Sequence, residues 1–369
     1  MARLSKKPLK RLDLTLKSDA EDELVSTLRH RLVGQETAIA ALVDAYVIFK
    51  SGLSDPEHSI ANLMFLGPTG VGKTLSLEIM AEVLFGTKQA LKKVNCAEFQ
   101  HSHEIAKLIG SPPGYLGHRD TPAYLRQENL DQNHTADNAL TLLLFDEFEK
   151  ANDALWTLLL GILDKGTVTL GDSKTTTFKN CIIAMTGNLG AREMQFLLRG
   201  GMGFQGSATR TQEEIDKGTD KAGIDAMNKK FPPEFINRID DIVVFHALDP
   251  RQLGQVIDIE LEQVQSRILK MQDKRQFVLD FTPAAKEFLL DKGTDIKNGA
   301  RPLKRTIERH IVKRLARFLS TGQIELGDLV MVDRNDDGLK FACMAKGVLA
   351  NIAEEEEALA AEAAAGIRP

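Results

Sequence analysis

The feature that most constrains this chain is a glycine-rich segment, Gly67-Pro-Thr-Gly-Val-Gly-Lys-Thr74, which matches the pattern G-x-x-x-x-G-K-[ST]. It follows the apolar run 62–66, a predicted buried strand, and precedes a predicted helix over about 73–85. Such a strand–loop–helix unit turns backbone N–H groups toward phosphate oxygens, and the helix N-terminus adds its dipole. We therefore predict a phosphate-binding loop in which Lys73 reaches the β- and γ-phosphates of a nucleotide and the Thr74 hydroxyl binds Mg²⁺.

Further strands are expected in the part of the chain that follows this loop, at 92–95, 140–145, 181–186 and 241–245. The longer runs are continuously apolar, and segments with helical periodicity separate them. That pattern is typical of a parallel sheet that helices cover on both faces. We therefore predict the α/β fold class, with a parallel sheet flanked by helices.

Polar residues follow two of the predicted strands at their carboxyl ends. Asp146 and Glu147 come directly after one apolar run, and Asn188 follows another. Ligands of open α/β sheets bind at this edge, so we expect these side chains to face the phosphates. Asp146 is predicted to hold Mg²⁺ together with Thr74, and Glu147 to polarise the attacking water. The neutral amide of Asn188 can either orient that water or contact the γ-phosphate, and the sequence leaves both roles open.

Two arginines are further candidates for the chemistry. Arg238 lies just before the predicted strand at 241–245, and Arg301 lies at the start of a predicted helix in the C-terminal part. An arginine from a neighbouring subunit can stabilise the charge on a transferred phosphoryl group, with effects of about 10³–10⁵ in rate. Either arginine can also be an ordinary surface ion-pair partner, and the sequence does not separate these readings.

The character of the chain changes after Pro250. Helices are expected at 251–272, 283–291 and 301–319. A short pair of strands is expected at 277–281 and 329–332. This predicts a second domain that is smaller than the first and mostly helical.

The predicted organisation has four parts: a basic N-terminal arm (1–20), a large α/β nucleotide-binding domain (21–248), a small C-terminal lid domain (249–335) and a C-terminal segment with an Ala/Glu-rich tail (336–369). Within the large domain, residues 200–223 are rich in Gly, Ser and Thr and are predicted to form a mobile loop.

Composition excludes several function classes. The formal net charge of −5 gives no overall attraction to nucleic acid. We find no apolar run near the ~18 residues that a membrane span requires. Cys96, Cys181 and Cys343 are scattered without metal-ligand spacing, which favours a reducing compartment. We therefore expect a cytoplasmic protein with neither a nucleic-acid nor a membrane partner.

Together these motifs resemble the AAA+ ATPase module of the Clp unfoldases and disaggregases, in particular the second module of ClpB, ClpA and ClpC. The resemblance covers about residues 25 to 335. The stretches that carry it are Arg31-Leu-Val-Gly-Gln35, Ser51-Gly-Leu-Ser-Asp-Pro56, Phe65-Leu-Gly-Pro-Thr-Gly-Val-Gly-Lys-Thr74, Asp146-Glu-Phe-Glu-Lys-Ala151, Pro233-Glu-Phe-Ile-Asn-Arg-Ile-Asp240 and Asn298-Gly-Ala-Arg-Pro-Leu-Lys-Arg305.

The resemblance implies roles for residues that the motifs alone leave open. Leu32 and Val33 are expected to flank the adenine of ATP, and Asn188 to be the sensor-1 residue. Arg238 resembles the arginine finger that acts on a neighbouring subunit, and Arg301 the sensor-2 arginine that touches its own nucleotide. The predicted ligands of ATP and Mg²⁺ are Leu32, Val33, Gly67, Pro68, Thr69, Gly70, Val71, Gly72, Lys73, Thr74, Asp146 and Arg301.

The resemblance also gives meaning to two loops. Gly110-Ser-Pro-Pro-Gly-Tyr-Leu-Gly117 is similar to the family's pore loop, in which Tyr115 and Leu116 would grip a translocating polypeptide. Flanking glycines allow such a loop to shift. Met202-Gly203-Phe204 is similar to the apolar-Gly-Phe tripeptide with which some Clp ATPases dock a ClpP-type peptidase, which makes such a peptidase a candidate partner.

The expected function is that of an ATP-dependent unfoldase or remodelling chaperone whose ring, in that family a hexamer, threads polypeptide through a central pore. The sequence holds one ATPase module, and Pro232 replaces the arginine of the family's Phe-Arg-Pro-Glu-Phe. Both departures put substrate recruitment in doubt. The alternative is an ATP-switched assembly or disassembly factor for one partner complex, without processive threading. A nucleic-acid motor is a third class, which the acidic charge disfavours.

Overall fold

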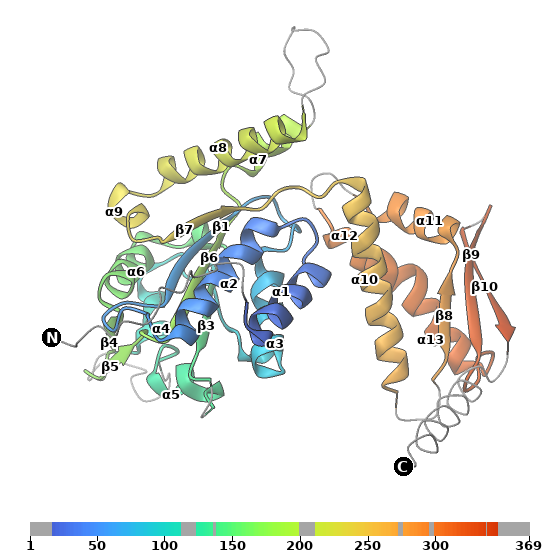
Figure 1. The fold of residues 1–369 in the computed structure, drawn as a ribbon, viewed down its shortest axis with the longest axis horizontal. Helices are drawn as coiled ribbons and strands as arrows, with labels where there is room; N and C mark the ends of the chain where they lie inside the picture. Colours follow the sequence, from blue (N-terminus) through green and yellow to red (C-terminus); the bar gives the residue numbers. More distant parts are fainter. Residues whose placement is uncertain are drawn as a thin grey trace, which may run out of the picture.

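The computed structural model describes residues 17–111, 123–135, 138–198, 211–271, 276–294, 299–336 and 338–345. They form a large α/β domain and a smaller domain, joined by the chain between β7 and α10 (Figure 1). In the described residues, no helix has the length and apolarity to cross a bilayer.

The large domain is built on a five-stranded sheet with the strand order β2-β3-β6-β1-β7. Every neighbouring pair in this sheet is parallel. The strands are β1 (Ala61–Leu66), β2 (Lys92–Asn95), β3 (Thr141–Asp146), β6 (Cys181–Gly187) and β7 (Asp241–Val244). The predicted α/β fold with a parallel sheet is therefore confirmed. All five carboxyl ends lie at one edge, which is where the sequence places the phosphate-binding loop.

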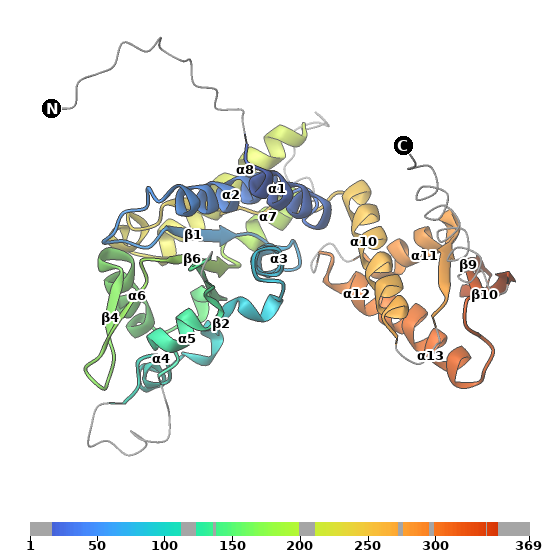
Figure 2. The ribbon, with the colours of Figure 1, turned by 60° about the horizontal axis from the view of Figure 1, so that its bottom comes forward.

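Alternate residues of each central strand enter two separate cores, one on each face of the sheet. Leu63 and Phe65 of β1 pack with α1 (Asp19–Arg31), α2 (Glu36–Ser51) and α3 (Lys73–Phe85). Met64 and Leu66 pack instead with α6 (Asp153–Lys165), α7 (Ala191–Leu198) and α8 (Gln212–Lys230). In Figure 2, α1 and α2 lie over one side of β1 and β6, and α6 lies over the other. Burial on both faces explains why the strands read as continuous apolar runs.

Shorter elements complete the large domain. They are the helices α4 (Ala106–Ile109), α5 (Gln127–Leu130) and α9 (Pro233–Ile236), the 3-10 turns Lys88–Ala90, Cys96–Glu98, Ser102–Ile105, Asp131–Asn133 and Phe148–Lys150, and the hairpin of β4 (Thr167–Thr169) with β5 (Thr175–Thr177). The hairpin strands are three residues each and rich in threonine, so they carry no long apolar run for the sequence to reveal.

The small domain packs helices on a three-stranded sheet of order β10-β9-β8. Its elements are α10 (Pro250–Leu269), β8 (Val278–Phe281), α11 (Pro283–Gly293), α12 (Arg301–Ile307), a π-helical turn (Glu308–Val312), α13 (Lys313–Ser320), β9 (Leu329–Asn335) and β10 (Gly338–Ala345). Asp249 caps α10 in a capping box with Gln252, which fixes where the second domain starts. β10 pairs antiparallel with β9, so this domain continues past residue 335, the boundary expected from the sequence.

The prediction of a mobile loop over 200–223 is wrong for its second half, because α8 begins at Gln212. Thr211 and Glu214 form a capping box that starts the helix, a local signal that composition had obscured. Gly223 lies where α8 meets α7, and a Cβ there would approach Met194 Cε to 2.7 Å. This glycine therefore allows close helix packing. Residues 200–210 lie outside the described part of the chain.

Candidate active site

The glycine-rich loop requires glycine at two positions for steric reasons. Gly67 leaves β1 with φ +140°, and a Cβ there would lie 2.5 Å from Phe245 O. Gly72 precedes α3 with φ +110°, and a Cβ there would lie 2.7 Å from Leu32 Cδ1. L-residues with side chains rarely adopt such φ values. The loop therefore holds its backbone in a shape that only this glycine spacing permits.

Lys73 is buried at the first position of α3, with 8% of its surface exposed. Its Nζ donates to Gly67 O (2.6 Å), Pro68 O (2.7 Å) and Asn188 Oδ1 (3.0 Å). Burial lowers the pKa of Lys73 to about 8, although the charges of Glu149 and Asp146 oppose that shift. The amine thus lies beneath the loop among oxygen acceptors, within reach of an anion bound by the loop.

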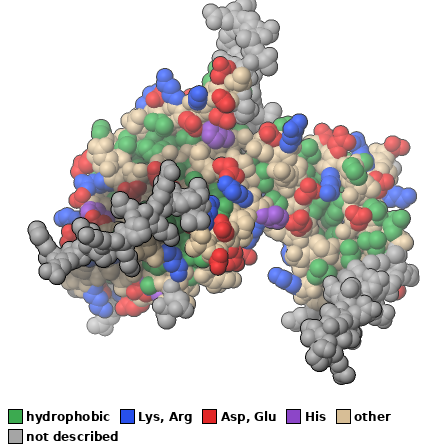
Figure 3. Space-filling view, in the orientation of Figure 1, with side chains coloured by type: hydrophobic (Ala, Val, Ile, Leu, Met, Phe, Trp, Pro, Cys, Tyr) green, Lys and Arg blue, Asp and Glu red, His purple; other side chains and the backbone are tan. Residues whose placement is uncertain are grey.

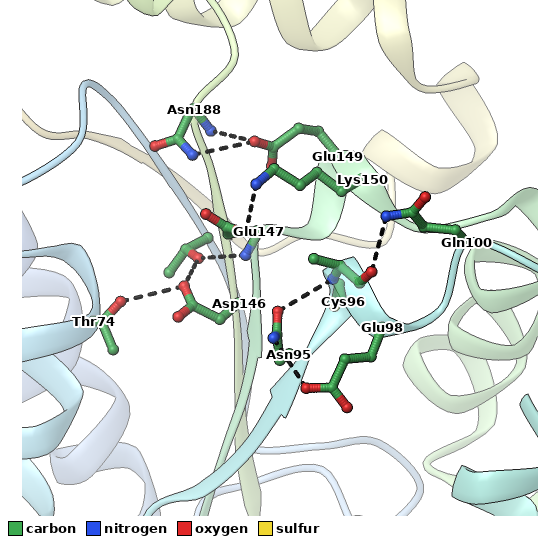
Figure 4. Close-up of polar contacts among 12 residues, drawn as sticks. Thr74, Asn95, Cys96, Glu98, Gln100, Asp146, Glu147, Glu149, Lys150 and Asn188 are labelled. Atoms are coloured by element: carbon green, nitrogen blue, oxygen red, sulfur yellow. Dashed lines mark hydrogen bonds and ion pairs between the residues drawn. The ribbon is translucent and has the colours of Figure 1, made fainter. Parts of the chain in front are cut away.

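Asp146 ends β3 at the centre of a hydrogen-bond cluster (Figure 4). Its Oδ1 accepts from Thr74 Oγ1 (3.2 Å) and Thr186 Oγ1 (2.5 Å), and its Oδ2 pairs with Lys93 Nζ (2.6 Å). Burial alone would raise the pKa of Asp146, but the hydrogen bonds from Lys93 and Thr186 hold it below its usual value. The carboxylate and the adjacent Thr74 hydroxyl supply the hard oxygen ligands that Mg²⁺ prefers.

Glu147 is held in an unusual backbone conformation, with φ 58° and ψ 44°. Its N–H donates to Thr186 Oγ1 (3.1 Å), and its Oε2 pairs with Lys150 Nζ (2.6 Å). A left-handed conformation at a residue with a side chain carries strain, which concentrates at functional sites. The strain here turns the chain sharply after β3 and places the carboxylate on the cavity.

Asn188 connects the loop lysine to a second carboxylate. Its Oδ1 accepts from Lys73 Nζ (3.0 Å), while its N–H and Nδ2 both donate to Glu149 Oε1 (3.1 and 3.3 Å). Figure 4 shows the contacts of Asn188 with Glu149 and the amide oxygen directed away from that carboxylate. The amide is thus fixed in one orientation.

Four residues of this cluster were not predicted: Lys93, Glu149, Lys150 and Thr186. Lys93 lies in a strand that the sequence predicted, but only the folded sheet pairs β2 with β3 and thereby brings Lys93 to Asp146. Glu149 and Lys150 lie within four residues of Asp146 in the sequence. Both lie in the stretch 146–151 that carries the resemblance, but no role was assigned to them there.

One cavity of about 380 Å³ joins these residues to the small domain. Its lining residues are Arg31, Leu32, Val33, Thr69, Gly70, Val71, Gly72, Lys73, Thr74, Leu75, Glu78, Ile79, Lys93, Asp146, Glu147, Thr186, Asn188, Leu248, Val256, Ile259, Glu260, Gln263, Ala300, Arg301 and Lys304. In Figure 3 the surface is hollowed between the two domains, and acidic and basic side chains are intermixed over both. The predicted residues Leu32 and Val33 line the cavity from one side and Arg301 from the other.

Arg238 lies at the opposite edge of the sheet. Its carbonyl accepts from Asn62 Nδ2 (3.2 Å) at the start of β1, and its guanidinium pairs with Asp164 and with Glu234 (3.6 Å). A strand of six residues spans about 20 Å, so Arg238 does not reach the cavity of its own chain. Its Nε is buried without a hydrogen-bond partner among the described residues.

The predicted pore-loop residues Tyr115 and Leu116, and the tripeptide 202–204, lie outside the residues that the structure describes.

The contact between the small domain and the loop depends on Gly299. Ala300 N donates to Gly70 O (3.1 Å), and a Cβ on Gly299 would lie 2.9 Å from the carbonyl oxygens of Thr69 and Gly70. We expect Gly299→Ala to push the small domain away from the phosphate loop. ATP binding should then weaken on the order of tenfold, about 1.4 kcal/mol. Titration with a fluorescent ATP analogue measures this.

Gly322→Ala is the matched control for this prediction. Gly322 also lies in the small domain with positive φ (+70°, against +57° for Gly299), but a Cβ there meets nothing within 4 Å. Both variants should lose about 1 kcal/mol of folding stability from backbone strain. Equal ATP affinities in the two variants would contradict the steric explanation.

Two family descriptions match the chain. The AAA domain (Cdc48 subfamily) matches residues 58–242, and the C-terminal, D2-small domain of ClpB protein matches residues 248–332. The two matches meet near the connection between β7 and α10, which is where the structure changes from the large to the small domain.

Individual relatives agree with these matches. Chaperone protein ClpB 2 of Nostoc sp. is 36% identical over 322 residues, which are 87% of this chain and 34% of that protein. The mitochondrial chaperone protein ClpB3 of Oryza sativa is 35% identical, with 84% of this chain and 30% of that protein covered. A cryo-EM structure titled as the closed state of Hsp104 with ATPγS and FITC casein matches with a TM-score of 0.72 and 30% identity, over 89% of this chain and 53% of that one. The chain thus spans about a third of the length of these curated relatives.

Proposed function

The chain belongs to the AAA+ ATPases of the Clp family, and from this premise we propose that it hydrolyses ATP within an oligomeric ring and uses the energy to thread and remodel polypeptides. The observation that supports this most is one cavity at the carboxyl edge of the sheet. Its lining includes the phosphate loop with Lys73, the acids Asp146 and Glu147, the amide of Asn188 and, from the small domain, Arg301.

The roles we propose follow from the contacts of each side chain. The loop backbone and Lys73 hold the phosphates, since Lys73 Nζ already lies against the loop. Thr74 and Asp146 hold Mg²⁺, which neutralises phosphate charge when bound. Glu147 accepts a hydrogen bond from the attacking water and polarises it toward the γ-phosphorus. Asn188 lines the phosphate end of the cavity, where its amide can contact the attacking water or the γ-phosphate.

The adenine end of the cavity lies between the two domains. We propose that Leu32 and Val33 contact the adenine ring, since both line the cavity near the loop. Arg301 lies across the cavity at the start of α12, from which it can contact the phosphates of its own nucleotide. A bound nucleotide would therefore connect the two domains, which couples hydrolysis to their relative position.

We propose that the active assembly is a homo-oligomeric ring, a hexamer as the resemblance implies. Arg238 lies at the sheet edge opposite the cavity and pairs with Asp164 and Glu234, so the role proposed for it in hydrolysis requires a nucleotide of a neighbouring subunit. The similar Hsp104 structure is described as containing a nucleotide analogue and casein, a polypeptide, which supports a polypeptide substrate for this chain.

Docking of a ClpP-type peptidase through residues 202–204 stays a prediction. So does the cytoplasmic location, since one relative is named as mitochondrial.

The pore-loop prediction separates threading from the alternative of a switched assembly factor. We expect Tyr115→Ala to retain basal ATP hydrolysis and to lose at least tenfold in the unfolding rate of a tagged fluorescent protein. A flat aromatic side chain offers a large contact area to a translocating chain, and alanine offers little. Loss of reporter fluorescence in the presence of a refolding trap measures the rate.

Leu116→Val is the matched control, since it keeps an apolar side chain beside the tyrosine and should unfold the reporter normally. A wild-type protein that hydrolyses ATP and forms rings, yet unfolds no tagged reporter with any adaptor supplied, would favour the assembly factor.

A further inference from the structure

Glu149 is a carboxylate of the active site to which the proposed hydrolysis assigns no role. Its Oε1 accepts two hydrogen bonds, from the backbone N–H and from Nδ2 of Asn188. Its Oε2 is buried and has no hydrogen-bond partner among the described residues. A buried carboxylate oxygen is costly, so the contact with Asn188 calls for an explanation beyond surface charge.

The position of Glu149 is fixed by the packing of its neighbour. Glu149 lies in the 3-10 turn Phe148–Lys150 that follows β3. Phe148 is fully buried, and its ring stacks on those of Phe231 and Phe235 at 5.4 and 5.3 Å. Because this aromatic cluster anchors the turn, the carboxylate next to Phe148 is rigidly placed at the end of β6.

A carboxylate at this place determines the orientation of the Asn188 amide. An ionised carboxylate can only accept hydrogen bonds, so Nδ2 must face Glu149. The opposite atom, Oδ1, then faces the loop, where it accepts from Lys73 Nζ at 3.0 Å. A reversed amide would bring Oδ1 against the carboxylate and Nδ2 against the ammonium group, which loses two hydrogen bonds and adds two repulsions.

We propose that Glu149 is a positioning residue that directs Asn188 Oδ1, and not Nδ2, toward the phosphates. Asn188 is then a hydrogen-bond acceptor for the attacking water and not a donor to the γ-phosphate, because phosphate oxygens and Oδ1 are both acceptors. This inference rests on the proposed ATPase function. It selects one of the two roles that the sequence left open for this amide.

Glu149→Gln tests the proposal, because a glutamine can donate as well as accept and so removes the constraint on the amide. We expect kcat for ATP hydrolysis to fall about tenfold, with the affinity for ATP unchanged within twofold. Asn188→Ala should lower kcat by about 10²-fold, the loss typical of one catalytic hydrogen bond. The double variant Glu149→Gln/Asn188→Ala should equal Asn188→Ala alone, since Glu149 acts only through Asn188.

An exchange of donor and acceptor provides a second and independent readout. Asn188→Asp alone places two carboxylates in contact and should lower kcat at least as much as Asn188→Ala. Adding Glu149→Gln restores a donor that faces the new carboxylate, so the swapped pair should recover at least tenfold over Asn188→Asp. Recovery of kcat without a matching rise in melting temperature separates this exchange from a merely structural role for Glu149, which would restore both together. Glu98→Gln is the control, since Glu98 contacts Asn95 and not Asn188.

Three results would overturn the proposal: wild-type kcat in Glu149→Gln, losses that multiply in the Glu149→Gln/Asn188→Ala variant, or no recovery in the swapped pair. Thermal melting of each nucleotide-free variant separates a folding defect from a catalytic one, and the swapped pair keeps the test decisive if Glu149→Gln alone is unstable. A wild-type chain that does not hydrolyse ATP would refute the proposed function instead, which a direct ATPase assay distinguishes.

Discussion

Replacement of Glu147 by glutamine should make ATP turnover very slow and leave ATP binding and oligomer formation intact. Lys73, Thr74 and Asp146 keep their contacts in this variant, so the phosphates and Mg²⁺ retain their ligands. The glutamine amide cannot serve as a base toward the attacking water, and the loss of a general base typically costs about 10²–10⁴ in rate. We expect kcat to fall by at least 10²-fold.

The measurement is single-turnover hydrolysis together with the affinity for a fluorescent ATP analogue and the oligomer mass with ATP present. Lys150 pairs with Glu147, so Lys150→Ala serves as a companion variant that removes the partner and keeps the carboxylate. Turnover of Glu147→Gln within a few-fold of wild type would show that another group activates the water. A loss of ATP binding would show that Glu147 supports the site structurally.

Arg238→Ala should bind ATP normally and lose about 10³-fold or more in hydrolysis, the lower end of the effect of an arginine finger. The guanidinium lies at the opposite edge of the sheet from the cavity of its own chain, where Asp164 and Glu234 pair with it. Its removal therefore leaves every contact of its own phosphate loop unchanged. The loss should appear only at a nucleotide held between two subunits.

Mixing two inactive variants tests this action between subunits. Arg238→Ala subunits keep Lys73, and Lys73→Ala subunits keep Arg238, so rings that contain both present some complete interfaces. We expect the mixture to recover measurable hydrolysis, with a maximum at intermediate ratios. The control mixes Arg238→Ala with the double variant Lys73→Ala/Arg238→Ala, which completes no interface. An inactive mixture in rings shown to contain both subunits would argue that Arg238 does not act in trans.

The parts of the fold that the sequence predicted are those that local patterns encode. A strand with both faces buried is mostly apolar, so β1, β3 and β6 appear as runs of four or five apolar residues. The phosphate loop is visible because its steric limits, at Gly67 and Gly72, require glycine at fixed spacing. Asp146 and Asn188 could be proposed as site residues because each lies at the carboxyl end of such a strand.

The prediction from local composition was wrong where composition and a helix-capping signal disagreed. Gly, Ser and Thr over 200–223 indicated a loop, yet Thr211 and Glu214 cap a helix within it. Gly223 lowers helix propensity by about 1 kcal/mol relative to alanine, but it allows α8 to pack against Met194 of α7. Tertiary packing thus overrides the local preference, and a single sequence does not display that packing.

The sequence by itself determined the parallel α/β fold, the phosphate loop and the acids that follow β3, because each depends on residues adjacent in the chain. The tertiary structure decided which groups meet. The strand order β2-β3-β6-β1-β7 places Lys93 beside Asp146 and Asn188 beside Glu149, and it separates Arg238 from the cavity of its own subunit. Strand order and register follow from packing between segments that are distant in the sequence. The hydrogen-bond partners of the proposed catalytic residues, and with them the orientation of the Asn188 amide, therefore emerge only from the folded molecule.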